Sequence, residues 1–316
     1  MGVLAISGAG LYGVGADPSI LSAEGLTAFP VAARGLFAGG DTTGNVNTID
    51  YVEIATTGNA TDFGDLTFSR SNLAACSSST RGLFGGGFTN ANSNVIDYVT
   101  ILTLGNATDF GDLTARRYLA ACSSSTVGIF GGGYINANSS FIDSVTIATT
   151  GNAVTFGNLT VVRFGLGGCS SPTRGLFTGG AQIGGTNQNV IDYITIASAG
   201  NAIDFGDLTA AGTTKSCSSS TRGINFIDNG IIDYVTIATT GNATDFGDML
   251  LVRNSSDACS SSSRGLNAGG STGGPSRSNV IEYVEIATTG NAVDFGDLTV
   301  ARFGPAACSN AHGGLG

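Results

Sequence analysis

Short apolar runs alternate with clusters of Gly, Ser, Thr and Asn along most of the chain, and this pattern predicts β-strands joined by turns. Residues 73–114 contain one full cycle, whose longest apolar run is rich in β-branched side chains. Gly105 and Asn106 predict a tight hairpin after that run, because both residue types accept positive φ. Four strands are therefore expected in this cycle, over residues 73–77, 81–84, 95–102 and 108–113.

The third expected strand is largely apolar on both of its sides. Successive side chains of a strand point to opposite faces of the sheet. The two alternating sets are Ile96, Tyr98 and Thr100 on one side, and Val95, Val99 and Ile101 on the other. Because both sets must be covered, each sheet is expected to lie between two other sheets.

Three sequence markers recur six times, at intervals of about 47 residues. The phenylalanine of an Asp-Phe-Gly word recurs at Phe63, Phe110, Phe156, Phe205, Phe246 and Phe295. A glycine at the start of the second expected strand recurs at Gly35, Gly82, Gly128, Gly175, Gly223 and Gly265. A cysteine recurs at Cys76, Cys122, Cys169, Cys217, Cys259 and Cys308. The sequence therefore predicts an all-β, six-bladed β-propeller with four antiparallel strands in each blade.

The order of the markers also predicts how the ring closes. The first unit begins at its second strand, with Arg34, whereas the chain ends with a first strand over 306–309. The C-terminal strand is expected to complete the blade that Arg34 begins, which removes an open sheet edge. The propeller is then expected to span 34–316, with residues 1–33 as an N-terminal extension that docks on a neighbouring protein.

The repeated unit resembles the kelch repeat. In that family a strand that ends in two glycines precedes a strand bearing tyrosine and then an aromatic residue, usually tryptophan. Gly86, Gly87, Tyr98 and Phe110 occupy these places here, and the agreement extends from Arg34 to Cys308. The chain departs from the family in having phenylalanine at the last place and no tryptophan at all. The resemblance implies a propeller.

Composition narrows the set of partners. Hydrophobic residues make up 41% of the chain and charged residues 11%, which is enough to bury a large core. The formal net charge is −10 and Lys215 is the one lysine, so we expect neither nucleic acid nor an anionic membrane as a partner. No apolar run is long enough for a membrane-spanning helix. Residues 1–7 lack a basic region, so they are expected to be a mature N-terminus rather than a signal peptide.

The six cysteines are expected to be small, buried thiols on the innermost strands. They are related by the rotation of the ring, which keeps them too far apart for disulfide bonds. A metal ring is the alternative, but no pair of cysteines has the spacing of metal ligands. We therefore expect no metal and no cofactor. Reduced thiols fit assembly in a reducing compartment.

The word Asp-Phe-Gly-Asp places two carboxylates close together in five units, whereas the third unit has Thr155 and Asn158 instead. We expect these acids to cap turns or to pair with arginine, and calcium binding is the alternative. Catalysis is not expected, because an active site needs one asymmetric place. His312 is the single histidine, which argues against a Ser-His-Asp triad. The chain is expected not to be an enzyme.

Two groups of residues are candidates for binding, both in loops expected on the same face of the propeller. The first is a set of arginines in the loops between blades that could meet an acidic partner or a glycan carboxylate, with salt bridges to nearby aspartates as the alternative. Its members are Arg70, Arg117, Arg163, Arg253 and Arg302. The second lies in the variable loops between the second and third strands and comprises Asn90, Asn92, Tyr134, Asn136 and Asn138.

The wording of residues 75–87 (ACSSSTRGLFGGG) and 95–114 (VIDYVTILTLGNATDFGDLT) resembles repeat proteins of marine bacteriophages, cyanophages among them. The resemblance implies a structural virion protein of the tail, fibre or capsid surface that is assembled in the host cytoplasm. Its partners would be other virion proteins, reached through residues 1–33, and a glycan on the host surface. A glycan-binding adhesin and a cellular kelch-type interaction module are the alternatives.

Overall fold

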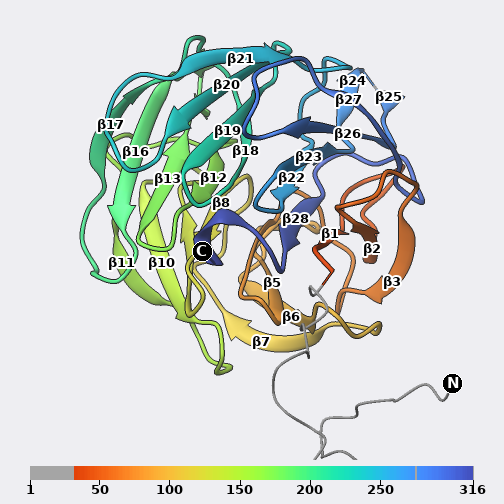
Figure 1. Ribbon diagram of the computed structural model, residues 1–316. Helices are drawn as coiled ribbons and strands as arrows, with labels where there is room; N and C mark the ends of the chain where they lie inside the picture. Colours follow the sequence, from red (N-terminus) through yellow and green to blue (C-terminus); the bar gives the residue numbers. More distant parts are fainter. Residues whose placement is uncertain (1–31, 275, 316) are drawn as a thin grey trace, which may run out of the picture. The chain divides into compact units, whose positions relative to one another are not determined.

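The structure is a computed structural model that describes residues 32–274 and 276–315. Within these residues six four-stranded antiparallel sheets form the blades of a ring, as Figure 1 shows. The predicted six-bladed β-propeller is confirmed. The predicted docking role of residues 1–33 falls almost wholly on residues outside the described part.

Each blade has its strands in sequence order from the axis outward, except that the C-terminal strand supplies the inner strand of blade 1. Blade 1 contains β28 (Ala306–Ser309), β1 (Arg34–Ala38), β2 (Thr48–Glu53) and β3 (Thr61–Asp65). Blade 2 contains β4 (Ala74–Ser77), β5 (Arg81–Gly85), β6 (Val95–Thr100) and β7 (Thr108–Asp112). Blade 3 contains β8 (Ala120–Ser123), β9 (Val127–Gly131), β10 (Phe141–Thr146) and β11 (Val154–Asn158).

The second half of the ring repeats this plan. Blade 4 contains β12 (Gly167–Ser170), β13 (Arg174–Thr178), β16 (Val190–Thr195) and β17 (Ile203–Asp207). Blade 5 contains β18 (Thr214–Ser218), β19 (Arg222–Ile227), β20 (Ile231–Thr236) and β21 (Thr244–Asp248). Blade 6 contains β22 (Asp257–Ser260), β23 (Arg264–Ala268), β26 (Val280–Glu285) and β27 (Val293–Asp297). Additional elements are β14 (Ala181–Gln182), β15 (Thr186–Asn187), β24 (Ser271–Gly273), β25 (Ser276–Arg277) and the short 3-10 helix η2 (Gly313–Leu315).

The C-terminal strand closes the ring as predicted. β28 pairs antiparallel with β1, so that Cys308 lies opposite Leu36. Beyond β28, the side chain of Asn310 accepts a hydrogen bond from the backbone nitrogen of Arg34 at 2.7 Å. Both inner strands of blade 1 are thereby paired, and no open edge remains at the junction.

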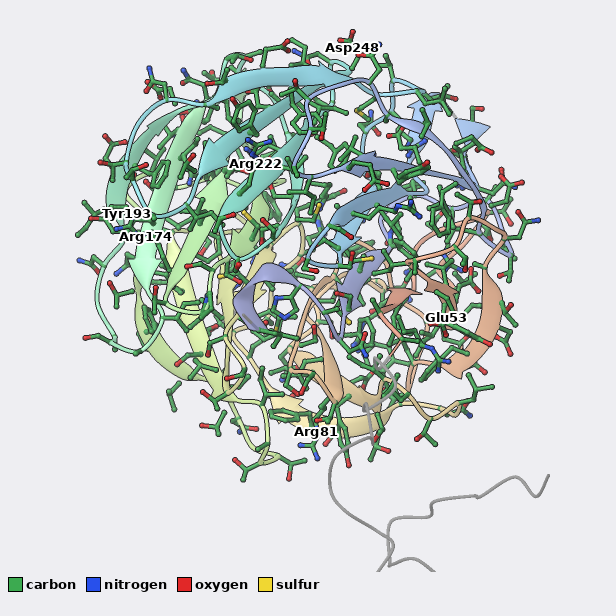
Figure 2. All side chains as sticks on the ribbon, viewed as in Figure 1. Glu53, Arg81, Arg174, Tyr193, Arg222 and Asp248 are labelled. Carbon is green, nitrogen blue, oxygen red and sulfur yellow. The ribbon has the colours of Figure 1, made fainter. Side chains whose placement is uncertain are left out.

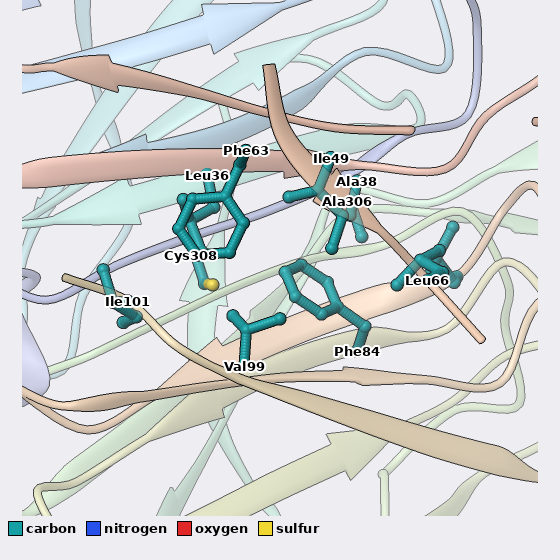
Figure 3. Packing of buried hydrophobic residues seen from close by; sticks show 11 residues of the cluster. Leu36, Ala38, Ile49, Phe63, Leu66, Phe84, Val99, Ile101, Ala306 and Cys308 are labelled. Carbon is teal, nitrogen blue, oxygen red and sulfur yellow. The ribbon is translucent and has the colours of Figure 1, made fainter. Parts of the chain in front are cut away.

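The hydrophobic core lies between neighbouring blades. Figure 3 shows one of these layers, in which Leu36 and Phe63 of blade 1 face Phe84 and Val99 of blade 2. Phe84 is fully buried. Each blade contributes both of its faces to such layers, which explains why the third strand is apolar on both sides. Removal of this area from water drives the blades together.

The repeated Gly-Asn word joins neighbouring blades. The amide oxygen of Asn106 in blade 2 accepts a hydrogen bond from the backbone nitrogen of Asp65 in blade 1, at 3.1 Å. Gly64 has a φ of +144°, and a Cβ there would lie 2.5 Å from the carbonyl oxygen of Gly105. The expected hairpin role was wrong for Asn106, because only Gly105 of the pair has positive φ. The side chain of Asn106 is needed for the junction instead.

All six cysteines are buried and free, as predicted. Each packs on the glycine marker of the following blade, so that a Cβ at Gly128 would lie 2.8 Å from the sulfur of Cys76. Burial raises the pKa of Cys169 and of Cys308 to about 12. Thiols with such pKa values are protonated and unreactive at neutral pH.

Candidate functional site

The loops that join one blade to the next surround the axis on one face of the propeller. In each of the described loops but one, a single residue with positive φ turns the chain toward the inner strand. These residues are Asn72, Tyr118, Gly165, Ser255 and Gly304. The backbone nitrogen of Tyr118 donates to the oxygen of Asn72 at 2.9 Å, and that of Gly165 donates to the oxygen of Tyr118 at 2.8 Å. The loops are thus bonded to one another around the axis.

A pocket of about 260 Å³ lies at the centre of these loops. We call it the axial pocket. Tyr118 and Phe164 supply aromatic surface, and the other polar groups include a cation and a carboxylate from blade 5 together with two amides. These polar side chains are Lys215, Asp228, Asn72 and Asn254. An aromatic wall with a few converging polar groups is typical of a ligand site.

The aromatic wall continues outward from the axial pocket. The rings of Tyr118 and Phe164 have centroids 5.8 Å apart, and Tyr134 meets Phe164 edge-on at 6.4 Å. The guanidinium of Arg117 lies 4.7 Å from the centroid of Tyr134 and 4.5 Å from that of Phe88. Such stacking holds the cation while leaving part of it open to solvent, since Arg117 is only half-buried.

The predicted loop residues are partly brought together here. Asn92 accepts a hydrogen bond from Arg117 at 3.3 Å, so Asn92, Tyr134 and Arg117 form one surface. Asn138 accepts from the backbone nitrogen of Ile183 at 3.2 Å and joins the loops of blades 3 and 4. Asn90 and Asn136 are exposed.

The predicted set of exposed arginines is wrong for four of its five members. Arg70, Arg163, Arg253 and Arg302 are buried. Arg163, for example, donates to the carboxylate of Asp192 at 3.0 Å and to the oxygen of Phe177 at 3.0 Å. Each of these arginines points into the blade that its loop precedes rather than to solvent. A buried arginine of this kind holds a blade together and is not available to a partner.

The fifth member, Arg117, is not the equivalent of the other four. The buried arginine of blade 3 is its neighbour Arg116, which lies 2.9 Å from the carboxylate of Asp143. Every buried arginine stands six residues before the cysteine of its blade, and this spacing selects Arg116 from the pair. Arg117 is an additional residue at the surface, and it alone of the predicted arginines contributes to the candidate site.

The acids that pair with the buried arginines were missed by the sequence analysis. They lie at one place in the third strand of five blades, at Asp50, Asp97, Asp143, Asp192 and Glu282. The signal was an acid at the third position of every third strand, between an isoleucine and, in five blades, a tyrosine. In blade 5 Asp233 keeps this place, but Gly212 replaces the arginine: its backbone oxygen accepts from Gly180 as that of Arg163 accepts from Gly133. Burial raises the pKa of Asp233, because the charged form has lost its water.

The acids of the Asp-Phe-Gly-Asp word lie nearer to the surface than those of the third strands. Asp109 is exposed and Asp112 is half-buried. Among the described residues no salt bridge includes an acid of this word, so the expected pairing with arginine is wrong. Residues 32–274 and 276–315 contain no group of three His, Cys, Asp or Glu side chains placed to hold a metal ion.

The other end of the axis is closed by serines and by the C-terminal segment. The serine that follows each cysteine donates its hydroxyl hydrogen to the backbone oxygen of the equivalent serine in the preceding blade. We call this closed cycle the serine ring; its members are Ser77, Ser123, Ser170, Ser218, Ser260 and Ser309. His312 lies 2.9 Å from the oxygen of Ser77 and accepts through Nδ1 from the nitrogen of Gly314 at 3.0 Å. A cavity of about 50 Å³ is lined by this ring, the cysteines and His312.

Lys215 and Asp257 line a smaller cavity of about 20 Å³ along the axis. Burial raises the pKa of Asp257, and the charge of Lys215 partly opposes this effect. Lys215 also lines the axial pocket. Lys215 therefore lies between the two cavities, and its charge acts on Asp257, which lines only the smaller one.

Comparison of the chain with models of protein families and with curated proteins gave no match. In the described part of the chain, no helix combines the length and the hydropathy needed to cross a bilayer. A proposal for the function therefore has to start from the fold and from the geometry of the site.

Proposed function

We propose that this chain is a non-enzymatic structural protein of a bacteriophage particle, in which the propeller is a rigid platform for binding. The observation that supports this proposal best is the axial pocket, which lies among the loops that join one blade to the next, on one face of a scaffold of six near-identical blades. The resemblance of its repeated words to those of marine bacteriophage proteins supports a place in the tail, the fibre or the capsid surface.

The rigidity of the platform follows from how the ring is held. The pairing of β28 with β1, the serine ring and the bonded loops around the axial pocket each join neighbouring blades. The serine ring is a closed cycle at one end of the axis, and bonds between successive loops add to it at the other end, so the opening of one blade would break bonds to both of its neighbours. Rigid presentation of loops lowers the entropy lost on binding.

The chemistry of the axial pocket favours binding over catalysis. His312, the single histidine, lies at the opposite end of the axis and is engaged by Ser77 and Gly314. Lys215 and Asp228 supply charge beside the aromatic wall of Tyr118 and Phe164. We propose that other virion proteins are bound through residues 1–33, which leaves the loop face for a target outside the particle.

A glycan of the host surface is the target that the axial pocket favours. A pyranose has an apolar face of C–H groups that packs on an aromatic ring, and hydroxyls that pair with amides and carboxylates. Tyr118, Phe164, Asn72, Asn254 and Asp228 supply both kinds of surface within one pocket. Lys215 would pair with a carboxylate of an acidic sugar.

Labelling of intact phage particles with an antibody against this chain tests the placement. Electron microscopy should show the label at one repeated position of the particle. Label that is absent from particles but present in host cells would overturn the proposal and favour a cellular interaction module.

A glycan array tests whether the chain binds glycans, independently of where it lies in the phage particle. The purified chain should bind a subset of glycans, and Tyr118→Asn should lose them. Asn72 occupies the equivalent place with positive φ, so this substitution removes the ring without straining the backbone. Leu104→Ala is the control and should bind as the parent does, because Leu104 is exposed between β6 and β7 and does not line the pocket. Equal binding by parent and Tyr118→Asn would exclude the axial pocket as the glycan site.

A further inference from the structure

Five of the six blades share a stacked arginine and tyrosine. The arginine begins the second strand, and its guanidinium carbon lies 4.3 to 4.4 Å from the ring centroid of a tyrosine in the third strand. The pairs are Arg34 with Tyr51, Arg81 with Tyr98, Arg174 with Tyr193, Arg222 with Tyr234 and Arg264 with Tyr283. Figure 2 shows Arg174 beside Tyr193.

The guanidinium of each stack also reaches the next blade. Arg81 of blade 2 donates to the carbonyl oxygens of Ile147 and Ala148 in blade 3, at 2.9 and 3.0 Å. Arg222 makes the equivalent bonds to Ile286 and Ala287. The stack therefore covers the seam between two blades and occupies carbonyl oxygens just beyond the third strand.

Blade 3 lacks both members of the stack. Val127 stands in place of the arginine and Ser144 in place of the tyrosine. The equivalent acceptors in blade 4 are the carbonyl oxygens of Ile196 and Ala197. Among the described residues, neither oxygen accepts a hydrogen bond from a side chain or from the backbone of a loop. The seam between blades 3 and 4 thus has the two carbonyl oxygens that would accept from a guanidinium, but no arginine to donate to them.

A cleft of about 330 Å³ marks this seam. We call it the blade 3–4 cleft; it is lined by Val127, Ser144, Phe156, Ile196 and Ala197 among others. The corresponding hollow in blade 5, where Arg222 and Tyr234 are present, measures about 190 Å³. Phe156 is 7% exposed, whereas its equivalent Phe110, which a tyrosine covers edge-on, is 2% exposed. The absence of the two side chains therefore leaves a larger open space at this seam.

We propose that the blade 3–4 cleft binds an arginine side chain of another protein. The planar guanidinium would donate to the oxygens of Ile196 and Ala197, as Arg81 does to Ile147 and Ala148. Its apolar stem would lie on Val127, and an aromatic neighbour in the partner would cover Phe156. A lysine fits less well, because its compact and strongly hydrated ammonium does not stack flat on an aromatic ring as a planar guanidinium does.

The occupant is not supplied by this chain. Its basic residues are Lys215 and twelve arginines, which run from Arg34 to Arg302, so residues 1–31 contain none. Five arginines form the stacks and five the buried pairs, while Arg117 bonds to Asn92 and Arg277 to Asp41. Each arginine of the described residues is therefore already engaged, and a second copy would have to break one of these contacts to insert it. A formal net charge of −10 favours a basic partner instead.

Titration of the isotope-labelled chain with N-acetyl-arginine amide, followed by amide NMR, tests the site. Saturable shifts are expected at residues 195–198 and at Val127, at millimolar concentrations. N-acetyl-lysine amide should produce much smaller shifts there. Equal shifts with both probes, or no shifts at these residues with the arginine probe, would overturn the proposal.

Two paired variants provide the controls. Val127→Arg with Ser144→Tyr installs the stack of the other five blades and should abolish the shifts at residues 195–198. Arg81→Val with Tyr98→Ser removes the stack from blade 2 and should create a second site, with new shifts at Ile147 and Ala148. Shifts that persist in the first variant, or a failure of the second to gain a site while it remains folded, would contradict the assignment. Should the first variant not fold, the second decides alone.

An aromatic residue near the arginine should strengthen binding. Residues two apart in an extended peptide face the same side, so N-acetyl-Tyr-Gly-Arg-amide presents both groups of the stack. The ring should improve affinity by up to about tenfold over the arginine probe. A peptide that binds no more tightly would exclude Phe156 as part of the site.

Discussion

The hydroxyl of Ser77 donates to the carbonyl oxygen of Ser309 across 2.6 Å, and this bond joins the blade that the C-terminus completes to the blade that follows it. Because the same bond is made at all six junctions, each serine both donates to one neighbour and accepts from the other. The ring is therefore closed by hydrogen bonds as well as by strand pairing. Buried bonds in such a cycle polarise and support one another.

Ser77→Ala should lower the free energy of unfolding by about 1–3 kcal/mol, because the buried oxygen of Ser309 loses its donor. Urea denaturation measures the change from the midpoint and the slope. Ser79→Ala, two residues further along the chain and exposed, is the matched control and should leave stability almost unchanged. Equal stability of the two variants would show that the serine ring contributes nothing net.

The buried arginine pairs make a second prediction, for which the chain contains its own control. Asp192→Asn leaves the buried guanidinium of Arg163 without a counter-charge and should cost about 3–5 kcal/mol. Asp233→Asn changes the same place in blade 5, where Gly212 replaces the arginine, and should cost about 1–2 kcal/mol.

Both aspartates accept from the hydroxyl and the backbone nitrogen of a threonine, Thr160 or Thr209, so the two substitutions disturb these bonds alike. The difference between the two losses in the free energy of unfolding therefore measures the contribution of the ion pair with Arg163. Urea denaturation at neutral pH measures both. A larger loss for Asp233→Asn would mean that the threonine bonds, not the ion pair, stabilise these positions.

The architecture could be predicted from the sequence because it depends on period and polarity alone. The recurrence of Phe63 and its equivalents fixes the number of blades, and the order of Arg34 and Cys308 fixes the closure. Small residues around Cys76 indicate a crowded axis. None of these inferences requires knowledge of where a long side chain points.

The arginines could not be placed in the same way, because the direction of a side chain depends on the path of its loop. The spacing to the cysteine distinguishes Arg70 from Arg117, but it does not say which of them is buried. Arg70 lies against Asp97 in the interior, whereas Arg117 lies on the surface against Phe88 and Tyr134. The axial pocket was missed for the same reason. Tyr118 and Phe164 are distant in the chain, and only the positive φ of Tyr118 and its bond to Asn72 bring the loops together.

The six thiols should be inert in the folded protein. All are buried, and burial raises the pKa of Cys169 and Cys308 to about 12, so the reactive thiolate is scarce at pH 8 or below. A colorimetric disulfide reagent should detect no thiol in native protein and all six after denaturation. A thiol that reacts quickly under native conditions would show that the axis opens to solvent.

The C-terminal segment should make stability depend on pH near neutrality. Burial lowers the pKa of His312 below its ordinary value of 6.5, although the oxygen of Ser77 opposes the shift. The neutral ring donates from Nε2 to Ser77 and accepts at Nδ1 from Gly314, and a proton on Nδ1 would break the second bond.

The sign of this pH dependence follows from the number of protons that His312 binds in the folded and in the unfolded chain. Well above pH 6.5 the ring is neutral in both states, so this residue adds no pH dependence there. As the pH falls below 6.5, the unfolded chain binds a proton that the folded chain resists, and the free energy of unfolding decreases. His312→Gln, which cannot titrate, should lack this part of the decrease between about pH 7 and about pH 5. Parallel stability curves for the parent and this variant over that range would show that His312 titrates alike in both states, and the C-terminal segment would then not sense pH.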